Sequence, residues 1–71
     1  MFFVVYEVQQ NANDVVSVIP TTKTDWNEAL STYYSICASA AISTIPYHAA
    51  YIIADDGSMR MCQVFDRRAV I

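Results

Sequence analysis

Four stretches of the chain are rich in hydrophobic residues and are bounded by turn-forming residues or by the helical segment, and this pattern predicts four β-strands. The first stretch, Phe2–Gln10, is rich in aromatic and β-branched residues and contains no helix breaker. The second covers Val15–Thr22 and contains Pro20, which predicts an edge position because proline cannot donate a ladder hydrogen bond. The third and fourth stretches are Tyr47–Ala54 and Met59–Asp66.

Turn-forming residues separate the strands into two hairpins. Residues 11–14, Asn-Ala-Asn-Asp, connect the first two strands, and asparagine and aspartate both tolerate positive φ. Residues 55–58, Asp-Asp-Gly-Ser, connect the last two and contain the Asp-Gly hairpin signal. Gly57 is the single glycine of the chain, so its position predicts this turn most clearly.

A helix separates the two hairpins. Asp25 with Glu28 three residues later matches a capping box, with Thr24 as the neighbouring alternative cap. Helical spacing continues from Trp26 to about Thr44, before Pro46 ends it. The residues at core spacing are Trp26, Ala29, Leu30, Tyr33, Cys37, Ala40, Ala41 and Thr44.

The opposite side of this helix has no charged residue after Glu28. Solvated helix faces normally carry lysine and glutamate, whereas this side combines small hydroxyl residues with apolar ones. We therefore expect it to contact another chain; the alternative is a serine-rich face exposed to solvent. The expected interface residues are Tyr34, Ser35, Ala38, Ser39 and Ile42.

These elements predict an α+β fold of ββαββ type, with one long helix packed on a four-stranded antiparallel sheet in a single domain, residues 1–71. One helix can cover only one face of such a sheet. Both faces carry apolar residues, Phe2 and Val4 on one and Phe3 and Val5 on the other. A second copy of the chain is the simplest cover for the remaining face, so we expect a homo-oligomer.

Composition supports this expectation. Of the 71 residues, 55% are hydrophobic and only 15% are charged, compared with about 25% in an average domain. The apolar run at the N-terminus breaks at Glu7 and lacks basic residues, so we expect neither a signal peptide nor a membrane span. Cys37 and Cys62 are interpreted as small buried hydrophobes in a reducing cytoplasm.

Charge argues against duplex nucleic acid as a partner, because the net charge is −3. Three of the four basic residues nevertheless lie within nine positions: Arg60, Arg67 and Arg68. Arginine binds phosphate in a bidentate manner, and aromatic rings stack on bases. We expect these arginines, with Trp26, Tyr33 and Tyr34, to bind a small phosphorylated ligand at a subunit interface. The alternative is that the arginines pair with nearby acids.

Catalytic and metal motifs are weak. Cys37, His48 and Cys62 lack the paired spacing of a metal site, so we expect neither metal nor cofactor. Cys37 with His48 is the one conceivable nucleophile–base pair, but Cys37 lies within the core stripe, where thiols are inert. His48 is interpreted as a hydrogen-bonded, half-buried histidine, and we expect a protein that is not an enzyme.

The chain resembles small uncharacterised proteins of bacteriophages and prophages of gut bacteria. The matching features are the run Val4–Gln9, the segment Trp26–Tyr34 that opens an Ala/Ser-rich helix, and the ending Phe65-Asp66-Arg67 after the Asp-Gly hairpin. The resemblance implies antagonism of host defence, either by sequestering a nucleotide immune signal or by blocking a nuclease as anti-CRISPR proteins do.

Together these features lead us to expect a cytoplasmic, non-enzymatic, homo-oligomeric binding protein that sequesters a nucleotide signal. One alternative is a protein–protein inhibitor of a host defence enzyme, in which an acidic surface mimics nucleic acid. The acids of that surface are Asp14, Asp25, Glu28, Asp55 and Asp56. The other alternative is a small virion or assembly protein.

Overall fold

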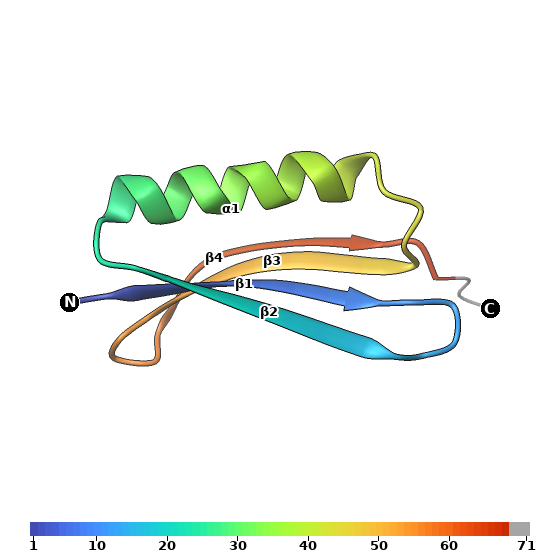
Figure 1. The fold of residues 1–71 in the computed structure, drawn as a ribbon, viewed down its shortest axis with the longest axis horizontal. Helices are drawn as coiled ribbons and strands as arrows, with labels where there is room; N and C mark the ends of the chain where they lie inside the picture. The colour runs from blue at the N-terminus through green and yellow to red at the C-terminus, as the bar shows by residue number, and fades with distance from the viewer. Residues whose placement is uncertain (69–71) are drawn as a thin grey trace.

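A computed structural model describes residues 1–68, and its elements follow the order ββαββ (Figure 1). The α+β fold predicted from the sequence is confirmed. The elements are β1 (Phe3–Gln10), β2 (Val16–Lys23), α1 (Trp26–Ala41), β3 (Tyr47–Ala54) and β4 (Met59–Asp66).

The four strands form one antiparallel sheet in the order β2-β1-β3-β4. The strands nearest the middle of the sheet, β1 and β3, come from different hairpins and pair from Phe3↔Ala54 to Gln10↔Tyr47. In β2, Pro20 lies opposite Tyr6 of β1. Within residues 1–68, β2 is an edge strand of the sheet, so the edge position predicted from Pro20 is confirmed.

Local signals form the helix start and the second turn as predicted. Asp25 is the N-cap of α1, and its Oδ2 accepts a hydrogen bond of 3.1 Å from the backbone N–H of Glu28. Gly57 has a φ of 84°, which glycine adopts without steric cost. The first hairpin turn instead relies on Asp14, whose φ is 62°.

The end of the helix was predicted three residues too late. Helix α1 ends at Ala41, and Ala41 and Thr44 are exposed rather than part of the core. Three β-branched residues and Pro46 follow within the next five positions, and the residue before a proline is biased toward extended backbone. The spacing of hydrophobic residues typical of a helix therefore continues about three residues beyond the observed end of α1.

One face of the sheet lies under α1, and we call it the covered face (Figure 1). Val5 and Ile52 are fully buried there, and Trp26 packs edge-on against Phe3 with 5.1 Å between ring centroids. Ile36, outside the predicted core stripe, also packs against this core. The buried core consists of Phe3, Val5, Ala29, Tyr33, Ala50, Ile52 and Ala54.

The other side of the sheet has no layer above it in Figure 1, and we call it the open face. Residues alternate between the two faces, so the pairing register assigns sixteen positions to it. They are Val16, Val18, Pro20 and Thr22 of β2, Val4, Tyr6, Val8 and Gln10 of β1, Tyr47, Ala49, Tyr51 and Ile53 of β3, and Met59, Cys62, Val64 and Asp66 of β4.

Candidate functional site

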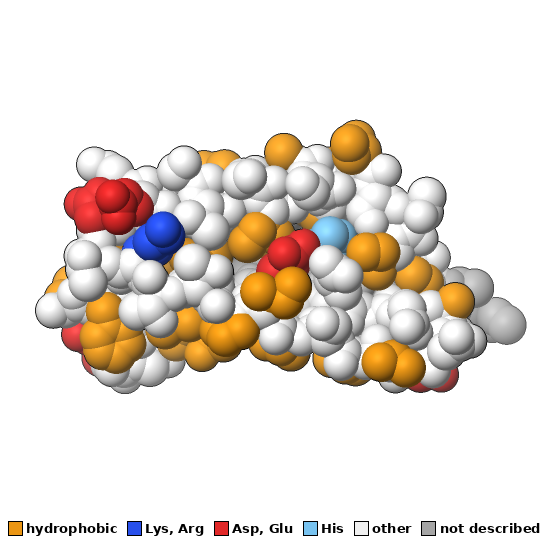
Figure 2. Space-filling model, viewed as in Figure 1, with side chains coloured by type: hydrophobic (Ala, Val, Ile, Leu, Met, Phe, Trp, Pro, Cys, Tyr) orange, Lys and Arg blue, Asp and Glu red, His pale blue; other side chains and the backbone are white. Residues whose placement is uncertain are grey.

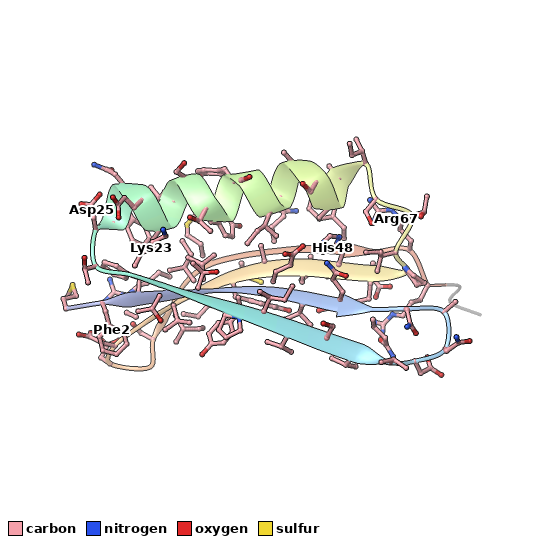
Figure 3. All side chains as sticks on the ribbon, viewed as in Figure 1. Phe2, Lys23, Asp25, His48 and Arg67 are labelled. Carbon is pink, nitrogen blue, oxygen red and sulfur yellow. The ribbon has the colours of Figure 1, made fainter. Side chains whose placement is uncertain are left out.

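A buried polar cluster lies on the covered face beneath α1, where Figure 3 places His48. His48 is only 3% exposed, and its Nε2 lies 2.6 Å from Oε2 of Glu7. Because a carboxylate only accepts, Nε2 carries the proton of this hydrogen bond. Gln9 donates from Nε2 to the same Glu7 oxygen at 3.0 Å. One carboxylate oxygen thus receives two hydrogen bonds.

The β1–β3 register brings the cluster together. Gln9 lies directly opposite His48, and Glu7 lies opposite Ala50 two positions along the strand. A signal for the cluster was present in the sequence, since Glu7 and Gln9 lie on the same strand face as the core residues Phe3 and Val5. The hydrogen-bond partner of His48 could not be predicted from the sequence, because no local pattern specifies that β1 pairs with β3. His48 is more buried than the half-buried position predicted.

A histidine hydrogen-bonded to a carboxylate is the arrangement that supplies the general base in the catalytic triad of hydrolases. The thiol considered as its nucleophile is engaged elsewhere: Cys37 is hydrogen-bonded to Tyr33, and burial raises the pKa of the Cys37 thiol. No pocket is found in the described part of the chain. Nδ1 of His48 is buried and lacks a hydrogen-bond partner in the same residues. The cluster therefore has the geometry of a buried polar contact within the core.

Arg67 is bound to the end of the helix. Its Nη2 donates to the carbonyl oxygens of Ala40 and Ala41, at 2.6 and 3.0 Å. These carbonyls belong to the last turn of α1, which leaves acceptors without intrahelical partners. Arg67 therefore acts as a C-terminal cap that ties the end of β4 to α1.

Arg68 is paired with a carboxylate at the rim of the open face. Its Nε and Nη2 donate to the two oxygens of Asp66, at 2.9 and 2.6 Å. The guanidinium lies over the ring of Tyr47, 4.7 Å from its centroid, and Nη1 donates to Gln10. Hydrogen bonds from Arg68 lower the pKa of the Asp66 carboxyl to about 2.

Arg60 lies at the other end of the same strand. Its Nε donates to Ser58 Oγ at 2.8 Å, and its Nη2 is 3.7 Å from Asp56. An eight-residue strand spans roughly 26 Å, so Arg60 is far from Arg67 and Arg68 within one chain. The three arginines thus do not form one patch. Arg60 and Arg68 pair with nearby acids, as in the alternative interpretation of the sequence, whereas Arg67 donates to backbone carbonyl oxygens of α1.

The three aromatic residues predicted to stack on bases have different surroundings. Tyr33 is buried, and burial raises the pKa of its phenol to about 12. Trp26 is half-buried against Phe3. Tyr34 is 57% exposed on the outer side of α1. All three belong to the first nine residues of α1, whereas Arg67 contacts its last turn, so one chain does not assemble the predicted ligand site.

The predicted helix interface lies on the surface. Tyr34, Ser35, Ala38, Ser39 and Ile42 are all exposed, and Ile42 is 86% exposed. They lie on the side of α1 away from the sheet, because the residues that contact the sheet occupy the opposite side.

The five acidic residues expected to form a surface that mimics nucleic acid are divided between the two ends of the molecule. The start of α1, with Asp25 and Glu28, and the β3–β4 turn, with Asp55 and Asp56, lie at one end in Figure 1, and Asp14 lies in the β1–β2 turn at the other. Figure 2 shows that the visible surface between the ends carries few charged side chains. An acidic surface that binds a host enzyme would therefore lie at one end of the molecule and not on a face of the sheet.

Within residues 1–68, no group of histidine, cysteine and acidic side chains has the arrangement of a metal site. This described region contains no helix that is both long enough and apolar enough to cross a membrane. No protein-family profile matches the sequence, and neither a curated protein nor a solved structure shows significant similarity to it.

Proposed function

We propose that this chain is a non-enzymatic binding protein that acts as a homo-oligomer. The open face is the observation that carries this proposal. Antiparallel sheets that face water on one side place polar residues there. Here the outward positions are occupied mainly by valine, tyrosine, alanine, isoleucine and methionine, so this face favours contact with protein over contact with water.

The resemblance to phage proteins supports a more specific form of this function, antagonism of host defence in the bacterial cytoplasm. Such a protein acts by stoichiometric binding, which requires a surface and not a reacting group. The alternatives are inhibition of a host defence enzyme through an acidic surface and a role in virion assembly, and both also depend on binding.

Sequestration of a nucleotide signal is the second candidate, and the Arg68–Tyr47 pair favours it. A guanidinium stacked on a tyrosine ring presents both a phosphate donor and a stacking surface. Because Arg68 already binds Asp66, a phosphate must displace that carboxylate. In this form of the proposal, residues from a second copy complete the site.

Native mass spectrometry of protein purified gently from a bacterial host tests both candidates. An oligomer without an added mass supports the binding protein. An oligomer carrying a nucleotide-sized mass, which Arg68→Ala removes, selects the second candidate. A monomer at every concentration overturns the proposal.

A further inference from the structure

Exposed apolar residues are concentrated on the open face. Ten large hydrophobic residues are strongly exposed among residues 1–68, and five of them belong to this side of the sheet. They are Phe2, Val16, Val18, Met59 and Val64, and Figure 3 places Phe2 on the side of the sheet away from α1. The outer side of α1 contributes only Tyr34 and Ile42.

Charge is nearly absent from the same face. Of its sixteen positions only Asp66 is charged, and this residue lies at a corner, 2.6 Å from Arg68. Two such faces can meet without like-charge repulsion in their interior. Most other protein surfaces carry charges that this face could not pair, so the face is most complementary to a copy of itself.

The size of the face is sufficient for a stable pair. Four strands of eight residues, at about 4.8 Å between strands and about 3.3 Å per residue, give roughly 500 Å² of sheet per copy. Pairing two copies removes roughly 1,000 Å² from water, about the area that a biological interface should exceed, and the side chains that project from this flat area add to it. The outer side of α1, a single helix, offers a narrower surface.

We infer that two copies of this chain pair through their open faces, sheet against sheet, to form a dimer with four layers in the order α-β-β-α. The inference rests on the proposed homo-oligomeric function and identifies the surface that it uses. The two sheets lie about 10 Å apart, as in β-sandwiches. Cys62 is enclosed between them, while the Arg68–Asp66 pairs remain at the rim.

Sedimentation velocity of three proteins tests this pairing. Val18→Glu combined with Val64→Glu places a charge on each edge strand of the open face. Both residues are at least 40% exposed, so the single chain tolerates the change. Ile42→Glu, at an 86% exposed position on the other side of the molecule, is the matched control. We expect a dimer for the wild type and for the control, and a monomer with unchanged far-ultraviolet circular dichroism for the double variant.

Thiol alkylation followed peptide by peptide gives a second readout. The sequence predicts that Cys62 is buried, but it is exposed in the single chain. In the dimer it is covered, whereas Cys37 contacts the core in both states. We expect Cys62 to react roughly tenfold more slowly in the wild type than in the double variant when the concentration is well above the dissociation constant. Equal rates would contradict the enclosed position of Cys62.

The outcomes separate the two proposals. An oligomer that the double variant retains overturns the open-face dimer but leaves the homo-oligomeric function standing, and its loss in Ile42→Glu would assign the contact to α1. A wild-type monomer with reactive Cys62 overturns both.

Discussion

The two faces of the sheet are built from the same four strands, yet within residues 1–68 α1 covers one of them and leaves the other open. On the covered face Val5 and Ile52 are fully buried, whereas on the open face Val18 is 51% exposed. Both faces are apolar, so hydrophobicity alone does not determine which one the helix covers. The sizes of the side chains differ, however. Strand β3 presents Ala50 and Ala54 on the covered face, while on the open face it presents Tyr47 and Tyr51 together with Ala49.

Small residues on the covered face let α1 approach the sheet, and Tyr33 fills the space that they leave. The connection contributes a second reason. Strands β2 and β3 are both antiparallel to β1, so they run parallel, and α1 is the crossover between them. Such crossovers are right-handed in nearly all proteins, which directs the helix to one face once the strand order is set.

Alanine substitutions of two adjacent isoleucines in β3 compare how much each face of the sheet contributes to the free energy of unfolding. We expect Ile52→Ala to lower the free energy of unfolding by about 3–4 kcal/mol, because it leaves a cavity in the core. Ile53→Ala, on the open face, should cost about 1 kcal/mol in the monomeric Val18→Glu/Val64→Glu background. Urea unfolding measures both. Equal losses would show that the two faces are equally covered.

His48 tests whether the polar cluster stabilises the covered face. We expect His48→Ala to cost about 2–3 kcal/mol, since it opens a cavity and removes a hydrogen bond from the Glu7 carboxylate. The control Glu7→Gln retains an acceptor for His48 and should cost about 1 kcal/mol. Chemical denaturation of both variants checks this order, and the reverse order would contradict the assigned geometry.

Two tyrosines on opposite sides of the sheet should titrate late for different reasons. The pKa values of both Tyr33 and Tyr51 are raised from 10.0 to about 12, by burial for Tyr33 and first by the hydrogen bond with Tyr47 for Tyr51. Because the folded state holds these protons more tightly, this stability is complete below pH 10 and is lost as the pH rises from 10 to 12. Each tyrosine should contribute up to about 2.7 kcal/mol to this loss, because a tenfold change in proton affinity corresponds to about 1.4 kcal/mol.

Tyrosinate absorbance, combined with urea unfolding across this pH range, measures the loss. Tyr47→Phe should return the pKa of Tyr51 toward its ordinary value and leave that of Tyr33 high. A parallel change in both would show that the two sides of the sheet are not independent.

The smallest expected difference in stability is between alanine substitutions of the neighbouring residues Arg67 and Arg68. Arg67→Ala should cost about 1 kcal/mol and speed amide hydrogen exchange in the last turn of α1, because two carbonyl groups lose their donor. Arg68→Ala removes an exposed ion pair at the rim of the open face and should leave monomer stability unchanged within error. Faster exchange in the Arg68 variant would mean that this residue also supports the helix.

Local chemistry determined much of the fold from the sequence alone. The helix start depends on Asp25 and Glu28, only three residues apart, and the second turn depends on Gly57. Hydrophobic stretches bounded by turn residues and by the helix predicted β3 and β4 with their observed bounds and β1 and β2 within one residue at each end. These features depend on hydrogen bonds and side-chain directions between near neighbours, which the order of residues specifies directly.

Only the tertiary structure decided what lies together. It paired β1 with β3 and thereby joined Glu7 to His48, 41 positions apart. It bound Arg67 to the helix end and Arg68 to Asp66, and it separated Arg60 from both, although the three arginines lie within nine positions. Strand order, register and the face chosen by the helix depend on contacts between distant segments, and a residue's neighbours in the chain do not reveal which distant surface it will meet.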